Sequence, residues 1–439
     1  MKKHTTLACS TLGLFAACTH HAAYAEFLND SKATLSMRNL YFNSDNRDGA
    51  AAPNKTEEWA QGFLLNYTSG FTEGTVGFGL DSLAMLGVTL DSGAGRHVGS
   101  SMIPSDGEGA AAQWGRIEPT AKMRLAKTEA RYGTLQPKIP VLMASDGRLL
   151  PQTFQGGQVT SKDLDNFTFT GGLISQVTGR GSTDRTGLSV VGGTQDSNKF
   201  YFAGTDYKAM KNLTLQYYFA RLDDYYDQHF FGLQHVWTLD AANSVSSDLR
   251  YFKTDSNGAN ASASGRAQGY AASGYSKDRK GEIDNDTWSA YFTYTHLAHS
   301  LTLGYQSVSD GSNFIQENQG SLVDKGAGGS SYYLFTDRML QSFVRAGEQT
   351  VFGQYAYDFA PLGVPGLRAS MVYLKGTGIK TYAGPEQSEW ERDVALEYVV
   401  QSGTFKGLGV AWKNGMARTE AGRNGDQNRL IFNYTLALF

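Results

Sequence analysis

The chain has 439 residues, with 39 Lys and Arg against 42 Asp and Glu, a formal net charge of −3 and two cysteines. This balance argues against a basic nucleic-acid binder, and both cysteines, Cys9 and Cys18, precede residue 25, so the remainder of the chain can form no disulfide. No apolar stretch reaches the roughly 20 residues that a membrane-spanning helix needs, which excludes a helical membrane protein.

The N-terminal segment has the pattern of a secretory signal peptide. Lys2 and Lys3 give a short basic start, residues 7–17 form an apolar run too short to span a bilayer, and Ala-Tyr-Ala at 23–25 is a small-residue cleavage pattern. An alternative stays open, because Phe-Ala-Ala-Cys at 15–18 is similar to a lipoprotein attachment site, although such sites normally begin with Leu.

We predict that residues 1–25 are removed on export and that residues 26–439 form one domain without a linker. That domain would keep 37 basic and 42 acidic residues, because the removed segment holds two lysines and no acid. The whole chain has 24 Tyr, 24 Phe and 51 Gly against 9 Pro. Many aromatic residues, glycine-rich loops and weakly alternating segments are typical of outer-membrane β-barrels.

Alternating apolar and polar residues recur from one end of this domain to the other. Successive side chains of a strand point to opposite faces, so each such segment predicts a strand with one apolar face. At the C-terminal end, Leu430, Phe432, Tyr434, Leu436 and Leu438 share one face. A soluble β-sandwich would show the same alternation with its apolar face inward. The alternating segments are 33–38, 122–126, 213–220, 288–295, 394–400, 408–413 and 430–439.

The connections between these segments alternate between short and long, as expected of antiparallel hairpins with periplasmic turns and extracellular loops. Together with export and size, this favours a barrel over a sandwich, and counting the segments gives about 18 strands. We therefore predict an all-β fold, an antiparallel transmembrane β-barrel with an inward-folded constriction loop. Short connections lie at 69–73, 240–244, 297–300, 360–366 and 402–407, and long ones at 44–57, 91–115, 138–160, 254–286 and 309–349.

Basic residues occupy the polar register of several predicted strands. Arg38, Lys122, Arg124 and Lys413 do so, and Arg131 follows one strand later. A cation that faces lipid at mid-depth costs roughly 2–4 kcal/mol, so these side chains are expected to face the lumen. There they would attract anionic groups, and Arg offers a planar fork that matches a carboxylate. The alternative is that basic and acidic residues pair across the lumen and only stabilise the wall.

The segment 138–157, KIPVLMASDGRLLPQTFQGG, is unusual for an outer loop. It is apolar in its first half, and its prolines cannot donate to a strand ladder. We expect it to be buried in the lumen, where it would narrow the pore, with Asp146 and Arg148 as rim charges. The alternative is an ordinary extracellular loop.

Enzyme and metal signatures are missing from the sequence. There is no HExxH, no Walker A loop and no GxSxG elbow. His296 and His299 would fall on opposite faces of a strand, and His229 and His235 share a face without an obvious third ligand. We therefore expect no catalytic residues, no metal and no cofactor.

Several long segments resemble the OprD-type substrate-specific porins of Gram-negative bacteria, and the resemblance runs across nearly the whole mature chain. The clearest segments are DSKATLSMRNLYFNSD at 30–45, PTAKMRLAKTEARYGTLQPKIPVL at 119–142, DGRLLPQTFQGGQVTSKDLD at 146–165 and GDQNRLIFNY at 425–434. The resemblance implies an 18-stranded barrel with one pore per chain and a third outer loop that folds inward as a constriction. It also implies a ladder of lumen basic residues used by solutes that carry a carboxylate. The positions that match this ladder are Arg38, Lys122, Arg124, Arg131, Lys375 and Lys413, with Arg148 in the matching constriction loop.

The chain also departs from the family pattern. Where relatives commonly carry two arginines separated by one residue, this chain has Ala411 and Lys413, and a further strand arginine corresponds to Val372. Part of the ladder is therefore missing, which puts the affinity for carboxylates in question. The segment 390–415 is more similar to members that take aromatic or cyclic carboxylates than to members that take basic amino acids.

The sequence thus predicts an outer-membrane channel for passive diffusion of small carboxylates, with aromatic or cyclic ones favoured. Its partners would be these solutes and outer-membrane lipid, not nucleic acid, and the sequence leaves open whether barrels associate. A basic amino-acid or peptide porin is the main alternative. A plugged structural barrel is less favoured, because a plugged lumen does not need a ladder of cations. A barrel enzyme is less favoured, because the sequence lacks a catalytic signature.

Overall fold

A computed structural model describes residues 27–47, 54–93, 95–97, 100–107, 109–316, 319–320 and 331–439. The predicted signal peptide at 1–25 lies outside the described residues. Among the helices of the described part, none is long and apolar enough to cross a membrane.

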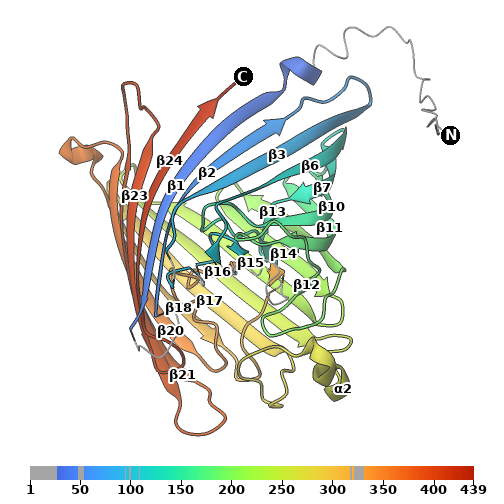
Figure 1. Ribbon diagram of the computed structural model, residues 1–439, viewed down its shortest axis with the longest axis vertical. Coiled ribbons are helices and arrows are strands. Elements are labelled where there is room, and N and C mark those ends of the chain that lie inside the picture. The colour runs from blue at the N-terminus through green and yellow to red at the C-terminus, as the bar shows by residue number, and fades with distance from the viewer. Residues whose placement is uncertain are drawn as a thin grey trace, which may run out of the picture.

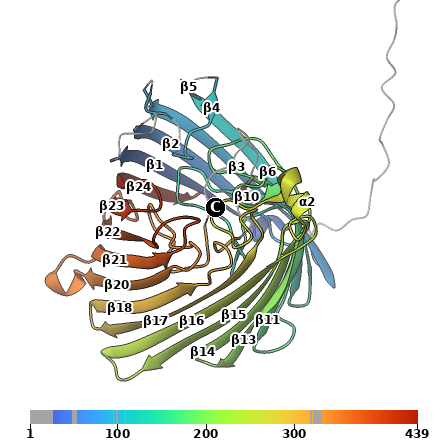
Figure 2. The same cartoon turned by 90° about the horizontal axis from the view of Figure 1, so that it is seen from below.

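The described chain forms one closed antiparallel sheet of 18 strands, which confirms the predicted fold (Figures 1 and 2). Each strand pairs with its neighbours in sequence, and the last strand pairs with the first, with Met37 opposite Tyr434, so the sheet has no free edge. The strands are β1 (Lys32–Asn46), β2 (Lys55–Thr68), β3 (Val76–Asp91), β6 (Gln113–Leu125), β7 (Thr128–Leu135), β10 (Thr153–Ser161), β11 (Phe167–Thr178), β13 (Phe200–Met210), β14 (Leu213–Leu222), β15 (Tyr226–Thr238), β16 (Asn243–Ser256), β17 (Asp284–His296), β18 (His299–Val308), β20 (Gln349–Asp358), β21 (Leu367–Ile379), β22 (Gln387–Val399), β23 (Gly409–Thr419) and β24 (Gly425–Ala437).

The alternation in sequence becomes an apolar outer face. On β6, Ile117 is 73% exposed, whereas its neighbours Arg116 and Glu118 point into the barrel. On β24, Leu430, Phe432 and Leu436 point outward, as the alternation predicted. In a membrane barrel the apolar outer side chains contact lipid, and the closed strand ladders give the backbone N–H and C=O groups their hydrogen bonds.

Short turns and the C-terminus lie at one end of the barrel, and the long connections lie at the other, where α2 (Ala263–Gly265) is seen (Figure 1). The connections carry further short elements. These are β4 (Ser105–Asp106), β5 (Gly109–Ala110), β8 (Lys138–Ile139), β9 (Leu142–Met143), β12 (Leu188–Ser189), β19 (Gln319–Gly320), the π-helix η1 (Arg266–Tyr270) and the 3₁₀ turn η2 (Ala360–Leu362).

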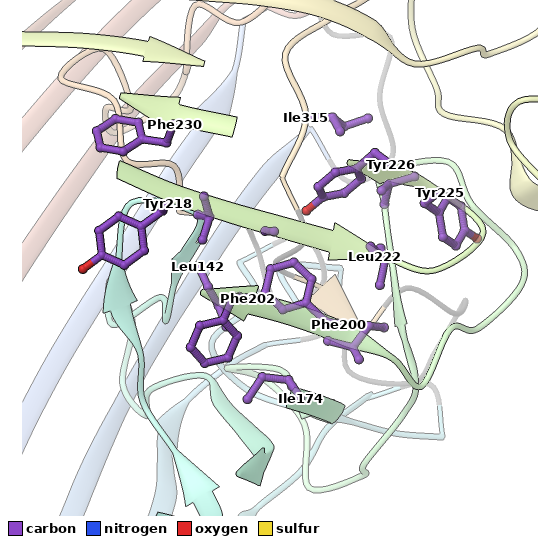
Figure 3. Packing of buried hydrophobic residues seen from close by; sticks show 14 of the residues in the cluster. Leu142, Ile174, Phe200, Phe202, Tyr218, Leu222, Tyr225, Tyr226, Phe230 and Ile315 are labelled. Carbon is purple, nitrogen blue, oxygen red and sulfur yellow. The ribbon is translucent and has the colours of Figure 1, made fainter. Parts of the chain in front are cut away.

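The largest apolar core lies inside the barrel rather than on its outer face. Inward side chains of the wall, among them Phe202, Tyr218 and Phe230, pack against Leu142 and Ile315 from the long connections (Figure 3). The alternation of apolar and polar residues along the strands predicts a polar inner face. The wall is apolar here because loops cover it, so this part of the interior is filled by side chains instead of water.

Candidate functional site

Three of the described connections fold into the lumen and narrow it: residues 136–152, residues 179–199, and the described parts of 309–348, which are 309–316, 319–320 and 331–348. β12 pairs with β19, with Leu188 opposite Gly320, which joins the second connection to the third. Gln316 donates from Nε2 to the carbonyl of Pro140 at 2.6 Å, which joins the third to the first. The inward segment predicted at 138–157 is therefore one of three. It also ends earlier than predicted, because Thr153 already begins the wall strand β10.

Apolar residues explain why the first connection turns inward. Leu149 and Leu150 are fully buried and pack in a cluster with Leu40 and Phe42 of β1. Near the other end of the loop, Leu142 joins the large interior core. Burying each such side chain is worth about 1.5–3 kcal/mol, which an exposed loop would forgo.

Charged groups fix the position of this loop. Arg38 of β1 donates from Nη1 to Oδ1 of Asp146 at 2.8 Å and to the carbonyl of Arg148 at 2.6 Å. Arg148 donates from Nε to the carbonyl of Ser100 at 2.6 Å, and its guanidinium lies 4.8 Å from the ring centroid of Phe42. The fold therefore brings together three of the site residues predicted from the sequence: Arg38, Asp146 and Arg148.

A cluster of arginines faces the narrowed lumen. Burial lowers the pKa of Arg148 well below its usual value, and the nearby Arg429 and Arg180 lower it further. Burial also lowers the pKa of Arg180 to about 10, with Arg429 again contributing. The guanidinium groups of Arg148 and Arg429 lie 4.8 and 5.8 Å from the same ring centroid, that of Phe42. Arg180 donates from Nη1 to Oγ of Ser145 in the loop that carries Arg148. The three like charges therefore lie close enough to repel one another. An anion that approaches them would relieve this repulsion.

The third connection also contacts this cluster. The backbone N–H groups of Leu340 and Gln341 donate to the two carboxylate oxygens of Glu391 at 2.9 and 2.6 Å. Arg429 of β24 donates from Nη2 to the carbonyl of Met339 at 3.1 Å. In the same loop, burial raises the pKa of Asp337 above its usual value. Wall side chains from β22 and β24 thus hold this loop beside the arginines.

Two polar cavities lie in the lumen beside the inward loops. One of about 670 Å³ is lined by residues of β2, β3, β6, β7 and β10, among them Asp81 and Arg131. The other, of about 370 Å³, lies against β20–β24. Its lining includes the basic residues Arg338, Arg368, Lys413 and Arg429 and the acidic residues Asp337, Asp393 and Glu397.

Residues 25–438 match the family model described as outer membrane porin, OprD family. The chain belongs to the OprD family. It is similar to the porin-like protein GalP of Pseudomonas putida, at 34% identity over 98% of this chain and 97% of GalP. It is also similar to the crystal structure of OccK8 (OprE) from Pseudomonas aeruginosa, with a TM-score of 0.87 and 48% identity over 94% of this chain and all of that one.

A further similar structure is that of Pseudomonas aeruginosa OpdK with vanillate. Its TM-score is 0.82, with 34% identity over 94% of this chain and all of that one. As a member of the OprD family, this protein is an outer-membrane porin, a channel and not an enzyme. Its functional site is therefore the lumen.

The predicted basic residues of β6 and β7 lie on the inner face, near the short-turn end. The ammonium group of Lys122 is buried and forms an ion pair with Oδ1 of Asp81 at 2.6 Å. The guanidinium of Arg124 lies 4.3 Å from the ring centroid of Phe71. Arg131 is more exposed and contacts Glu129 and, at 3.9 Å, Asp81. The contacts of Lys122 fit the alternative stated above, in which a basic residue pairs with an acidic one and stabilises the wall.

The two remaining predicted residues, Lys413 and Lys375, lie on opposite faces of the barrel wall. Lys413 lines the smaller cavity and forms an ion pair with Glu397 at 2.9 Å. Lys375 shares the outward register of β21 with Met371 and Tyr373, which are 48% and 44% exposed. The expectation that Lys375 lines the lumen is wrong, because the inward positions on either side are Leu374 and Gly376.

Sequence reasoning missed Arg180, Arg338 and Arg429. Arg429 shares a face with Ile431 and Asn433, so the alternation of the last strand contained the signal that would have found it. Arg180 and Arg338 lie in irregular connections, where no periodicity assigns a direction to a side chain.

Proposed function

We propose that this OprD-family porin passes small carboxylates by passive diffusion, and that aromatic or cyclic carboxylates are its preferred solutes. The proximity of Arg148 and Arg429, which both lie over the ring of Phe42, and of Arg180, which donates to Ser145 of the same inward loop, carries this proposal. Buried cations that repel one another form a charge-assisted site for an anion, and guanidinium groups match a carboxylate in shape. From there the solute reaches Lys413 and Arg368 in the smaller cavity.

Two observations support a ring on the solute. Val372 and Met339 line the same cavity, so apolar surface lies next to its cations. The structure of OpdK, a relative at 34% identity, was determined with vanillate, an aromatic carboxylate. If Val372 corresponds to a strand arginine of relatives, as the family resemblance implies, this wall gains apolar contact where it loses a charge.

A second candidate is a solute that also carries a positive charge, such as a basic amino acid. The observation that favours it is the presence of Asp337, Asp393 and Glu397 in the cavity that holds the basic residues. An ammonium or guanidinium group of the solute could contact these acids while its carboxylate contacts Arg429.

Uptake into vesicles separates the two candidates. With wild-type protein in liposomes, we expect labelled benzoate and vanillate to enter faster than labelled arginine at equal concentrations. The uncharged analogue benzamide should enter more slowly than benzoate, although it has the same size, because it lacks the carboxylate. Faster entry of arginine than of benzoate would favour the second candidate, and equal entry of benzoate and benzamide would contradict a carboxylate site.

A further inference from the structure

The outer face of β21, β22 and β23 carries a group of cations and aromatic rings near the long-loop end. Side chains in the outward register there include Tyr373 and Lys375 of β21, Trp390 and Arg392 of β22, and Arg418 of β23. The exposed Met371, Leu396 and Trp412 define this register on the three strands. We refer to these five residues as the outer cationic patch.

Strand pairing brings the patch together. Lys375 lies opposite Trp390, which lies opposite Arg418, and Tyr373 lies opposite Arg392. Lys375 and Arg392 are therefore diagonal neighbours on one face of adjacent strands, a spacing that long side chains bridge easily. Tyr373 and Trp390 occupy the other diagonal of the same two strands, and their rings stack with centroids 5.9 Å apart.

Two outward cations on other strands of the described chain have acidic partners. Arg221 of β14 pairs with Asp227 at 2.6 Å, and Lys253 of β16 pairs with Asp255 at 3.1 Å. Within the patch, Arg418 pairs with Asp426 at 2.8 Å.

Lys375 and Arg392 differ from these cations, because within the described part of the chain neither forms an ion pair. Arg392 donates from Nη2 to the amide oxygen of Asn414, while its Nε is buried without a hydrogen-bond partner. The patch therefore has positive charge and donor capacity that the described residues do not satisfy.

The lengths of β21 and β22 put the patch near the outer end of the apolar layer, where lipid headgroups begin. A tilted strand crosses the apolar layer with about 9–11 residues. Counted from the short-turn end, Lys375 is the ninth residue of β21 and Trp390 the tenth of β22. Tryptophan at this depth is typical of the membrane–water interface. A cation is costly at mid-depth and costs little near the interface, where an anionic headgroup can reach it.

We propose that Lys375 and Arg392 bind a phosphate group of a phosphorylated glycolipid in the outer leaflet, with Trp390 against the start of its acyl chains. A phosphate monoester accepts charge-assisted hydrogen bonds from both a guanidinium and an ammonium group. Two adjacent cations without an acidic partner therefore suit an anionic phosphate better than they suit a neutral headgroup. The site is independent of the lumen and of the solute that the lumen passes.

Native mass spectrometry of the refolded barrel in detergent tests this site with diphosphoryl lipid A as the probe. For Lys375→Gln/Arg392→Gln we expect roughly tenfold weaker lipid binding, which corresponds to 1.4 kcal/mol. The matched control Arg221→Gln/Lys253→Gln, which alters paired outer cations, should bind like the wild type. Wild-type protein should bind dephosphorylated lipid A as weakly as the double variant binds the intact lipid.

Equal binding of lipid A by the wild type and the double variant would overturn the proposal. So would full competition by inorganic phosphate, which would identify a site for free anions and not for lipid. Heat-modifiable migration on gels establishes that each variant is folded. The charge-preserving variant Lys375→Arg/Arg392→Lys should keep most of the lipid binding, and its loss would equally contradict a role for charge.

Discussion

Replacing both Arg429 and Lys413 by glutamine is expected to weaken the binding of benzoate in the lumen by about ten- to hundredfold. Hydrogen bonds to charged groups are worth about 1.5–3 kcal/mol each, and Arg338 and Arg368 remain in the same cavity to offset part of the loss. The measurement is the concentration of benzoate that half-saturates interruptions of the single-channel current.

A matched variant shows whether position matters as well as charge. Lys253→Gln also removes a cation, but from the outer face, where Lys253 pairs with Asp255. It should leave the half-saturating concentration unchanged. If the double lumen variant also leaves it unchanged, these two residues do not form part of the solute path.

Replacing Phe314 by alanine is expected to loosen the inward loops without unfolding the barrel. Phe314 is 2% exposed, and its ring packs edge-on against Phe252 of the wall and Tyr332 of the same connection, with centroids 5.1 and 5.7 Å away. Truncating a buried Phe costs about 3–5 kcal/mol. Because Phe314 belongs to a connection, this cost reduces loop docking, and single-channel conductance and open-channel noise should both increase.

The control for this variant is Phe231→Ala on β15. Phe231 is 50% exposed on the outer face, so its loss should change neither conductance nor noise. Wild-type conductance in a folded Phe314→Ala barrel would show that the interior core does not set the width of the pore.

The strands could be predicted from sequence because lipid and lumen impose opposite requirements on alternate residues. Leu430, Phe432 and Asn433 illustrate this on β24, where the outward side chains from Leu430 to Leu436 are apolar or aromatic. The same rule failed on β21. There Val372 and Leu374 are apolar although they point inward, because they pack with Phe343 of an inward loop. With apolar residues on both faces, alternation could not place Lys375.

The candidate site was less predictable than the fold. Asp146 and Arg148 could be proposed because the apolar sequence around them is wasteful in an exposed loop. Arg180 could not, because its contact is with Ser145 of a different connection. Arg338 contacts Phe335 of its own irregular connection, where no periodicity assigns a direction to either side chain. Lys122 had the right face, but its partner Asp81 lies on another strand, so its ion pair depends on the register between β3 and β6.

Single-channel recording of the refolded wild-type protein in a planar bilayer, with benzoate and then arginine added, tests whether the lumen selects carboxylates. A carboxylate-selective lumen predicts discrete current steps that benzoate interrupts at lower concentration than arginine. Interruption by arginine alone would contradict the preference for aromatic carboxylates. The absence of any steps from folded protein would contradict an open channel.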